Sequence, residues 1–240
     1  MVAPLRTIVV KIGGRLLHSI TATEINVGKT AEYAEVLRGL SDDGYRLAVV
    51  TGGGDAARLY IGAARRLGAS EALCDQIGIW TTRMNAYLLI TALGSKAHPV
   101  VPRTVYELVG ALESGKVVVM GGIQPGQSTD AVAAIASELS GAQLMIKATD
   151  VDGIYTADPK KDPNAERIPE ITHGELLKLI LDAGLQAGEY APLDPVALKI
   201  LARSRIPIRV VDGRNPENVR KAATGEPIGT LVKPEEKRET

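Results

Sequence analysis

The residues best suited to chemistry in this 240-residue chain lie where short apolar runs end in glycines. Three runs do so, giving Lys11-Ile12-Gly13-Gly14, Thr51-Gly52-Gly53-Gly54 and Met120-Gly121-Gly122. Ligands of open α/β sheets bind at the carboxyl ends of strands, where glycine lets the backbone approach and helix N-termini attract anions. A single glycine turn often has only a structural purpose. Three of them, all at strand ends, predict a cradle for a polyphosphate.

Two cations near these turns are candidates for acting on the phosphates. Lys11 ends an apolar run, and a charge is rarely placed in a buried strand without a partner. We expect it to act on a bound phosphate, with a solvated lysine at a strand end as the alternative. Arg58 lies one helical turn beyond the second glycine turn and is expected to clamp phosphates, unless it is solvated like Arg65 and Arg66.

Two other glycine motifs fit less well. Gly28-Lys29-Thr30 ends like a P-loop, but Thr23 stands where that loop requires its first glycine, and no strand precedes it. Gly52-x-Gly54-x-x-Ala57 matches the relaxed dinucleotide fingerprint, but that fingerprint requires an acidic residue at the end of the next strand, about 20 positions on. The acidic residues there fall in or beside a helical pattern. A dinucleotide-dependent dehydrogenase is therefore not favoured.

Composition restricts the partners. The 28 basic residues balance 28 acidic ones, and aromatic residues are 3% with no Phe, which argues against binding a nucleic acid polymer by charge or by base stacking. The single cysteine, Cys74, excludes a disulfide framework and a cysteine-cluster zinc site. We expect a cytoplasmic protein, because no segment has the apolar character of a signal peptide or a membrane span.

Short β-branched runs alternate with amphipathic patterns, which predicts an α/β fold with a mainly parallel sheet. Strands are expected at residues 7–12, 46–51, 116–120, 144–148 and 208–211, with a short one at 100–101. Helices are expected at residues 31–40, 56–67, 77–93, 105–112, 131–139, 176–181 and 196–202. With no repeat or long linker, we expect one domain over 1–240, made of lobes at about 1–140 and about 141–233 and a polar tail at 234–240.

Taken together, the motifs resemble the amino acid kinase superfamily, and within it the archaeal type of uridylate (UMP) kinase. The resembling segments are VVKIGG (9–14), the GGG turn with Arg58, DQIGI (75–79), TRMNA (82–86), GGIQPGQSTDAVAA (121–134), TDVDGIYTADP (149–159) and LDP (193–195). The resemblance implies a three-layer α/β/α sandwich with about eight mainly parallel strands. It places the acceptor in the lobe at about 1–140 and ATP in the lobe at about 141–233.

The resemblance implies ATP-dependent phosphorylation of UMP to UDP in pyrimidine nucleotide synthesis, by direct in-line transfer with Mg²⁺ held by ATP. The alternatives are a non-catalytic nucleotide- or oxyanion-binding homologue, or a superfamily kinase for N-acetylglutamate or isopentenyl phosphate. An isopentenyl phosphate kinase would need a histidine just after the second glycine turn, and residues 55–58 contain none. The family also implies a homohexamer, a trimer of dimers, and the apolar segment 77–93 with Trp80 is a candidate interface.

The family's site positions map onto this chain as follows. Those implied for ATP are Gly14, Arg15, Gly54, Arg58, Thr149, Asp150, Tyr155 and Asp158. Those implied for UMP are Gly53, Asp75 and the loop Ile123, Gln124, Pro125, Gly126, Gln127, Ser128 and Thr129. Asp75 would bind ribose hydroxyls and the loop would bind the uracil edge and the phosphate. Lys11 and Arg58 would be catalytic, and no residue is assigned as a metal ligand.

A few positions carry separate expectations. Arg15 stands where many relatives have a small residue, and Asp150 stands where asparagine is common. For Asp130 the favoured interpretation is helix capping, and organisation of a lysine or of magnesium is the other. Lys160 and Lys161 either help to bind phosphates or are solvated. The acceptor phosphate is already largely ionised, so no general base is needed, and surface or capping positions are expected for the three histidines (His18, His98, His173).

Overall fold

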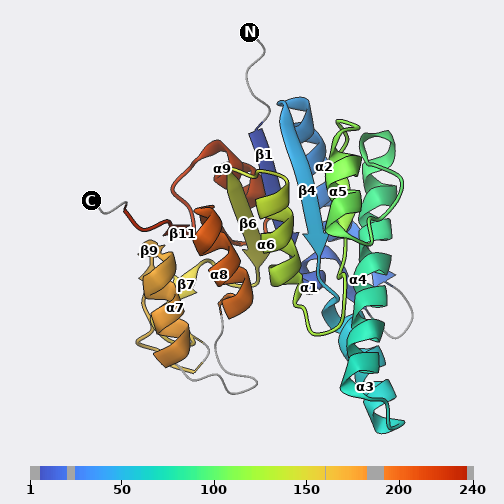
Figure 1. Ribbon diagram of the computed structural model, residues 1–240, viewed down its shortest axis with the longest axis horizontal. Helices are drawn as coiled ribbons and strands as arrows, with labels where there is room; N and C mark the ends of the chain where they lie inside the picture. The colour runs from blue at the N-terminus through green and yellow to red at the C-terminus, as the bar shows by residue number, and fades with distance from the viewer. Residues whose placement is uncertain (1–5, 21–24, 160, 183–191, 237–240) are drawn as a thin grey trace.

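The computed structural model describes residues 6–20, 25–159, 161–182 and 192–236 (Figure 1). Within these ranges seven strands form one sheet, in which only the β10–β11 pair is antiparallel. In spatial order they are β5 (Val118–Met120), β4 (Tyr45–Thr51), β1 (Arg6–Ile12), β6 (Leu144–Thr149), β10 (Ile208–Asp212), β11 (Thr230–Lys233) and β9 (Glu170–Thr172). The expected mainly parallel sheet is confirmed, with seven strands in place of about eight.

Four short strands form two hairpins beside the main sheet: β2 (Ser19–Ile20) with β3 (Ile25–Asn26), and β7 (Ile154–Tyr155) with β8 (Arg167–Ile168). The strand expected at 100–101 is not formed. The chain there follows a 3₁₀ turn, η1 (Gly94–Lys96), and reaches the sheet only through a bridge between Ala97 and Val117. Pro99 and Pro102 flank the segment, and proline has no N–H to donate to a ladder.

Helices form at all the predicted places. They are α2 (Gly28–Asp42), α3 (Gly54–Arg66), α4 (Glu71–Leu93), α5 (Val105–Leu112), α6 (Thr129–Leu139), α7 (His173–Asp182) and α8 (Pro195–Ser204), together with the unpredicted α1 (Gly14–Leu17) and α9 (Glu217–Thr224). The predicted and observed bounds differ most for α4, which begins at Glu71 and not at residue 77. Its start is set by Ser70, whose Oγ accepts a hydrogen bond from the Leu73 N–H. None of the described helices is long and apolar enough to cross a membrane.

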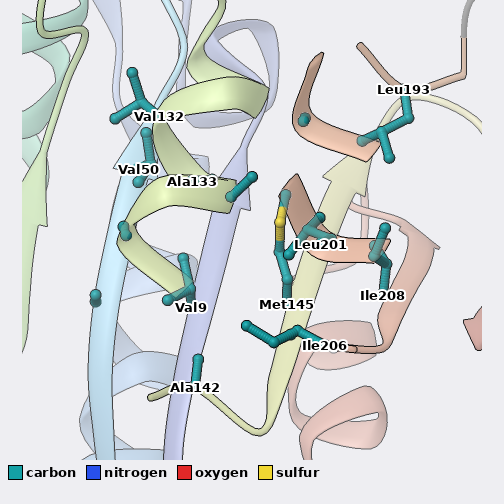
Figure 2. Close-up of a cluster of buried hydrophobic side chains, with 14 of the residues drawn as sticks. Val9, Val50, Val132, Ala133, Ala142, Met145, Leu193, Leu201, Ile206 and Ile208 are labelled. Atoms are coloured by element: carbon teal, nitrogen blue, oxygen red, sulfur yellow. The ribbon is translucent and has the colours of Figure 1, made fainter. Parts of the chain in front are cut away.

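Helices cover both faces of the sheet, because alternate strand residues point to opposite sides. On one face, Val9, Val50 and Met145 pack against α5, α6, α7 and α8. Figure 2 shows Val132 and Ala133 of α6 above these strand residues, with Leu201 of α8 beside Met145. On the other face, the intervening strand residues pack against α1, α2, α4 and α9. The result is the three-layer α/β/α sandwich that was expected.

Two histidines are buried, where surface or capping positions were expected. His18 follows α1 and His173 begins α7, and both are nearly inaccessible to solvent. Burial lowers the pKa of both imidazoles and favours their neutral form. The Nε2 atom of His173 lies 3.0 Å from the carbonyl oxygen of Ile206. The turn-like sequence that surrounds these histidines did not indicate that they would be buried.

Candidate active site

A cavity of about 370 Å³ opens at the carboxyl ends of β1, β4 and β6. Its volume falls within the range of about 300–1,000 Å³ that is common for small-molecule sites. Strand β1 has β4 on one side and β6 on the other, so the strand order reverses here, where open α/β sheets bind ligands. The predicted site residues in its wall are Lys11, Gly14, Arg15, Gly53, Gly54, Arg58, Thr129, Thr149 and Asp150.

At this cavity two lysines share one carboxylate. The Nζ of Lys11 lies 3.1 Å from Oδ1 of Asp130, and the Nζ of Lys147 lies 2.5 Å from Oδ2. The three side chains are between 9% and 13% exposed. Lys11 and Lys147 are opposite one another in the parallel β1–β6 ladder, and the first turn of α6 brings Asp130 to the same face. The group therefore holds two cations against one anion beside a cavity that Lys11 lines.

The electrostatics of this group keep Asp130 ionised. Burial alone raises the pKa of Asp130, but the Lys11 and Lys147 ammonium groups outweigh it, and the pKa lies well below its usual range. Burial lowers the pKa of Lys147, and the charge of Lys11 lowers it further, whereas Asp130 raises it. The carboxylate thus opposes the loss of the Lys147 proton and fixes the positions of both ammonium groups.

The favoured interpretation of Asp130 as a helix cap was wrong. Ser128 caps α6, since its Oγ accepts a hydrogen bond of 3.0 Å from the Ala131 N–H. The Asp130 side chain points instead to the two lysines, which was the second interpretation. Both residue types are common at helix starts, so the sequence alone did not separate a cap at Ser128 from one at Asp130.

Sequence reasoning missed Lys147. It carries the same signal that singled out Lys11, a charge inside a buried apolar strand, here LMIKAT. What the sequence did not provide was the ladder register that sets Lys147 beside Lys11. A lysine on the neighbouring strand, in register with the first, is the pattern that would have found it.

The first two glycine turns pack backbone on backbone at the cavity wall. A Cβ on Gly14 would lie 2.3 Å from the Gly54 nitrogen, and Gly54 itself has φ +63°. Because no side chain separates them, the starts of α1 and α3 meet beside Lys11. The third turn does not line the cavity: a Cβ on Gly121 would lie 2.4 Å from Thr82 Oγ1 in α4. Two glycine turns, rather than the three expected, therefore line the cavity.

This contact makes a sharp prediction for Gly14. The Gly14→Ala variant should lose about 1–3 kcal/mol of stability and most of its affinity for phosphates, because the new methyl group must push the second glycine turn away. Gly13→Ala is the matched control, since a Cβ there meets nothing closer than 3.6 Å. Urea unfolding and nucleotide binding by calorimetry would check both variants. Equal behaviour of the two alanine variants would contradict the proposed contact.

The loop that precedes α6 is joined to Asp75 of α4. The Gly126 N–H donates a hydrogen bond of 2.8 Å to Asp75 Oδ2, and Gly126 adopts φ +77°. At the end of the loop, the Ser128 hydroxyl donates to Asp194 Oδ2, at the start of α8. Thr129, which begins α6, lines the cavity. The predicted loop and Asp75, far apart in the sequence, are thus brought together.

The exposed rim of the cavity carries the remaining charges. The Arg15 Nη2 lies 3.2 Å from Asp150 Oδ2, so two of the predicted ATP positions pair with each other. Arg58 is largely exposed, and its Nη1 lies 3.6 Å from Asp55 Oδ1. A pair of this kind is worth only about 0–1 kcal/mol at a protein surface, so a bound phosphate can displace it at small cost.

Two predicted ATP positions are not among the residues that line the cavity. The Tyr155 hydroxyl donates a hydrogen bond of 2.7 Å to Asp152, in the segment just before the β7–β8 hairpin. The Asp158 carbonyl accepts from the Lys161 and Asp162 N–H groups and so forms a turn. Lys160, the other lysine expected near phosphates, lies outside the described residues.

The two rejected glycine motifs are also explained. Gly28 begins α2, in which Lys29 pairs with Glu32 and the Thr30 hydroxyl donates 2.6 Å to the Leu17 carbonyl. After Gly54 the chain forms α3 and then α4 before it reaches another strand. No strand end therefore lies about 20 residues on to carry a ribose-binding carboxylate. The rejection of the dinucleotide fingerprint is confirmed. For Gly28-Lys29-Thr30, the expectation that no strand precedes it was wrong, because the two-residue strand β3 ends at Asn26. Against a phosphate-binding loop stand the contacts of Lys29 and Thr30 with Glu32 and Leu17.

Comparison with known proteins places this geometry in a family. The model of the amino acid kinase family matches residues 6–212. The chain is 45% identical to a uridylate kinase of Hyperthermus butylicus and 49% identical to one of Methanothermobacter thermautotrophicus, and each match covers 95% of this chain and 99% of the relative.

Solved structures give the same grouping. The uridylate kinase of Archaeoglobus fulgidus superposes with a TM-score of 0.81 at 40% identity, covering 94% of this chain and 99% of the other. A UMP kinase of Bacillus anthracis also reaches a TM-score of 0.81, over 98% of both chains, but at 23% identity it supports the fold alone. The chain belongs to the amino acid kinase family and, within it, to the group of archaeal uridylate kinases.

Proposed function

We propose that the protein transfers the γ-phosphoryl group of ATP to UMP and releases UDP and ADP. The observation that supports this is the cavity of about 370 Å³ where Lys11, backed by Asp130 and Lys147, meets the two glycine turns and the start of α6. The uridylate kinases with which the chain shares 45–49% identity match almost over their full length and support the choice of UMP.

The chemistry needs positioning and charge neutralisation more than proton transfer. A phosphate oxygen of UMP, already largely ionised at neutral pH, attacks the γ-phosphorus in line. The bond from that phosphorus to the bridging oxygen breaks, and its electron pair leaves with ADP. No proton is removed from the nucleophile, so no general base is required. Lys11 at the cavity wall stabilises the charge on the transferring group, and Arg58 brings a second cation from the rim.

The division into subsites is the one that the family resemblance implies, and the cavity wall contains part of each subsite; Asp75 and residues 123–128 are not among the residues that line it. Gly14, Arg15, Thr149 and Asp150 would hold the donor phosphates, with Gly54 and Arg58 between the two nucleotides. Gly53, Asp75 and the loop of residues 123–129 would hold UMP. Tyr155 and Asp158 would contact the outer part of ATP beyond the cavity. The acceptor lobe at about 1–140 and the ATP lobe at about 141–233 would therefore meet at the lysines.

Magnesium is proposed to enter with ATP. In the described part of the chain no group of three or more His, Cys, Asp or Glu side chains could hold a metal ion. The nearest buried carboxylate, Asp130, is already engaged by two lysines. This donor set fits a Mg²⁺ ion held by phosphates and water. When bound, the ion neutralises charge on the β- and γ-phosphates.

The function is tested by a coupled assay of ADP release with UMP, CMP, AMP and N-acetylglutamate as acceptors. We expect turnover with UMP and the highest kcat/KM for it. Turnover with a non-nucleotide alone would overturn the proposal. Tight UMP binding with no turnover would favour the non-catalytic binding protein instead.

We also propose that the protein assembles as a homohexamer, a trimer of dimers, and works in the cytoplasm in pyrimidine nucleotide synthesis. Helices α3 and α4 lie together at one edge of the molecule (Figure 1) and expose large apolar side chains. These are Leu59, Tyr60, Leu73, Trp80, Met84 and Tyr87, and Leu67 just after α3 is also exposed.

This assembly predicts a species of six times 25.4 kDa in sedimentation equilibrium. Trp80→Glu should give a smaller species, because a buried interface does not accept an unpaired charge. Tyr106→Glu, at an exposed position on α5, is the control and should not change the mass. A wild-type monomer would refute the assembly.

A further inference from the structure

Helix α4 holds the loop of residues 123–129 and the glycine before it. Two consecutive residues of the TRMNA motif, Thr82 and Arg83, make the contacts at the start of the loop. The Thr82 Oγ1 accepts a hydrogen bond of 2.7 Å from the Gly122 N–H. The next residue, Arg83, donates from Nε to the Gly122 carbonyl at 3.1 Å and from Nη2 to the Ile123 carbonyl at 3.3 Å. Asp75, two turns earlier in α4, holds Gly126. One helix therefore fixes both the start and the middle of the loop.

The two carbonyl contacts of Arg83 determine the direction of two N–H groups. A trans peptide unit is planar, so its C=O and its N–H point in opposite directions. The Gly122 carbonyl shares a peptide unit with the Ile123 N–H, and the Ile123 carbonyl shares one with the Gln124 N–H. Because Arg83 takes both carbonyls, both N–H donors face away from its guanidinium group.

The guanidinium group is well placed to act as a rigid clamp. It is half-buried, and burial lowers the pKa of Arg83, as does the charge of nearby Arg103, while Glu107 opposes the change. Having lost part of its water, the group depends on the two carbonyl oxygens for hydrogen bonding. Its planar fork matches two adjacent acceptors, which a lysine ammonium does not.

We propose that Arg83 is a positioning residue for the acceptor nucleotide: it orients the loop of residues 123–129 so that backbone N–H donors face the oxygen acceptors of the nucleoside monophosphate. This inference rests on the proposed function for the identity of the acceptor. It does not depend on that function for the geometry of the loop, which can be measured without any substrate.

The test compares Arg83→Met with Arg103→Met. The second variant removes a neighbouring exposed charge whose side chain has no described bond to the loop. For Arg83→Met we expect KM for UMP to rise about tenfold, the effect of losing one charge-assisted hydrogen bond, while KM for ATP stays within about twofold. In ligand-free protein, the Gly122 and Gly126 amides should exchange with deuterium about tenfold faster. Arg103→Met should change none of these.

Equal increases in both KM values, or unchanged amide exchange in Arg83→Met, would overturn the proposal. Arg83→Lys is the second variant and keeps the charge without the fork. It should remain impaired in KM for UMP, and full recovery by lysine would also overturn the clamp. If the wild type does not phosphorylate UMP but Arg83→Met still loosens the loop, the failure belongs to the proposed function and the clamp stands.

Discussion

Replacing Lys11 with methionine should reduce kcat for UMP phosphorylation by about 10²–10³-fold, the usual effect of removing a group that stabilises charge only in the transition state. Of Lys11, Lys147 and Asp130, only Lys11 is among the residues that line the cavity, so its ammonium group is the one that we expect a phosphoryl group bound there to contact. The KM values should change much less than kcat. Steady-state kinetics with ATP and UMP would measure both.

The fold should survive this change, because Asp130 keeps Lys147 as its partner. Lys29→Met is the control: Lys29 is an exposed lysine paired with Glu32 on α2, and kcat should be unaffected. Full kcat in Lys11→Met, with native circular dichroism, would remove the assignment of Lys11 as the transition-state cation.

The second large effect is expected on stability, in Asp130→Asn. Removing the carboxylate leaves two nearly buried ammonium groups next to each other, and breaking a buried pair in this way costs about 3–5 kcal/mol. Urea unfolding at neutral pH would measure the loss. Asp43→Asn breaks the exposed pair with Arg220 instead, and it should cost no more than about 1 kcal/mol.

The double variant Asp130→Asn with Lys147→Met should regain part of the lost stability, because it removes one of the two uncompensated charges.

The contribution of Asp130 to the stability of the fold should depend on pH with a defined sign. The folded pKa of Asp130 is below its usual value of 3.8, so its carboxylate stabilises the fold above that pH and ceases to do so as the pH falls through the folded value. The gap between wild type and Asp130→Asn should therefore persist down to about pH 4. A gap that closes near pH 6 would contradict this electrostatic origin.

The sequence predicted elements whose patterns are long and local. The apolar runs of β1, β4, β5 and β6 could be found this way, as could Lys11 and the glycine turns that follow β1, β4 and β5. Short elements were missed, including β9, β11 and α9, because three to eight residues with few buried positions have no clear period.

Contacts between distant segments could not be predicted. The pairing of Lys147 with Asp130, the contact of Gly14 with Gly54, and the Arg83 clamp all depend on strand register and on how helices cross the sheet. The family resemblance implied which residues belong to the site, but it did not indicate how these residues contact one another. It also implied ATP positions at Tyr155 and Asp158, which are not among those that line the cavity.

The group formed by Lys11, Lys147 and Asp130 also has a consequence for the stage of synthesis at which the protein can become active. Lys11 and Lys147 are 136 positions apart (147 minus 11), and they meet only when β6 pairs with β1. We expect β1 to pair with β4 earlier, because that partner is closer in the chain. A nascent chain that has released β1, β4 and both glycine turns therefore holds the cradle with an incomplete set of charges. We therefore expect no phosphoryl transfer until more than half of the polypeptide has been synthesised and β6 has paired with β1.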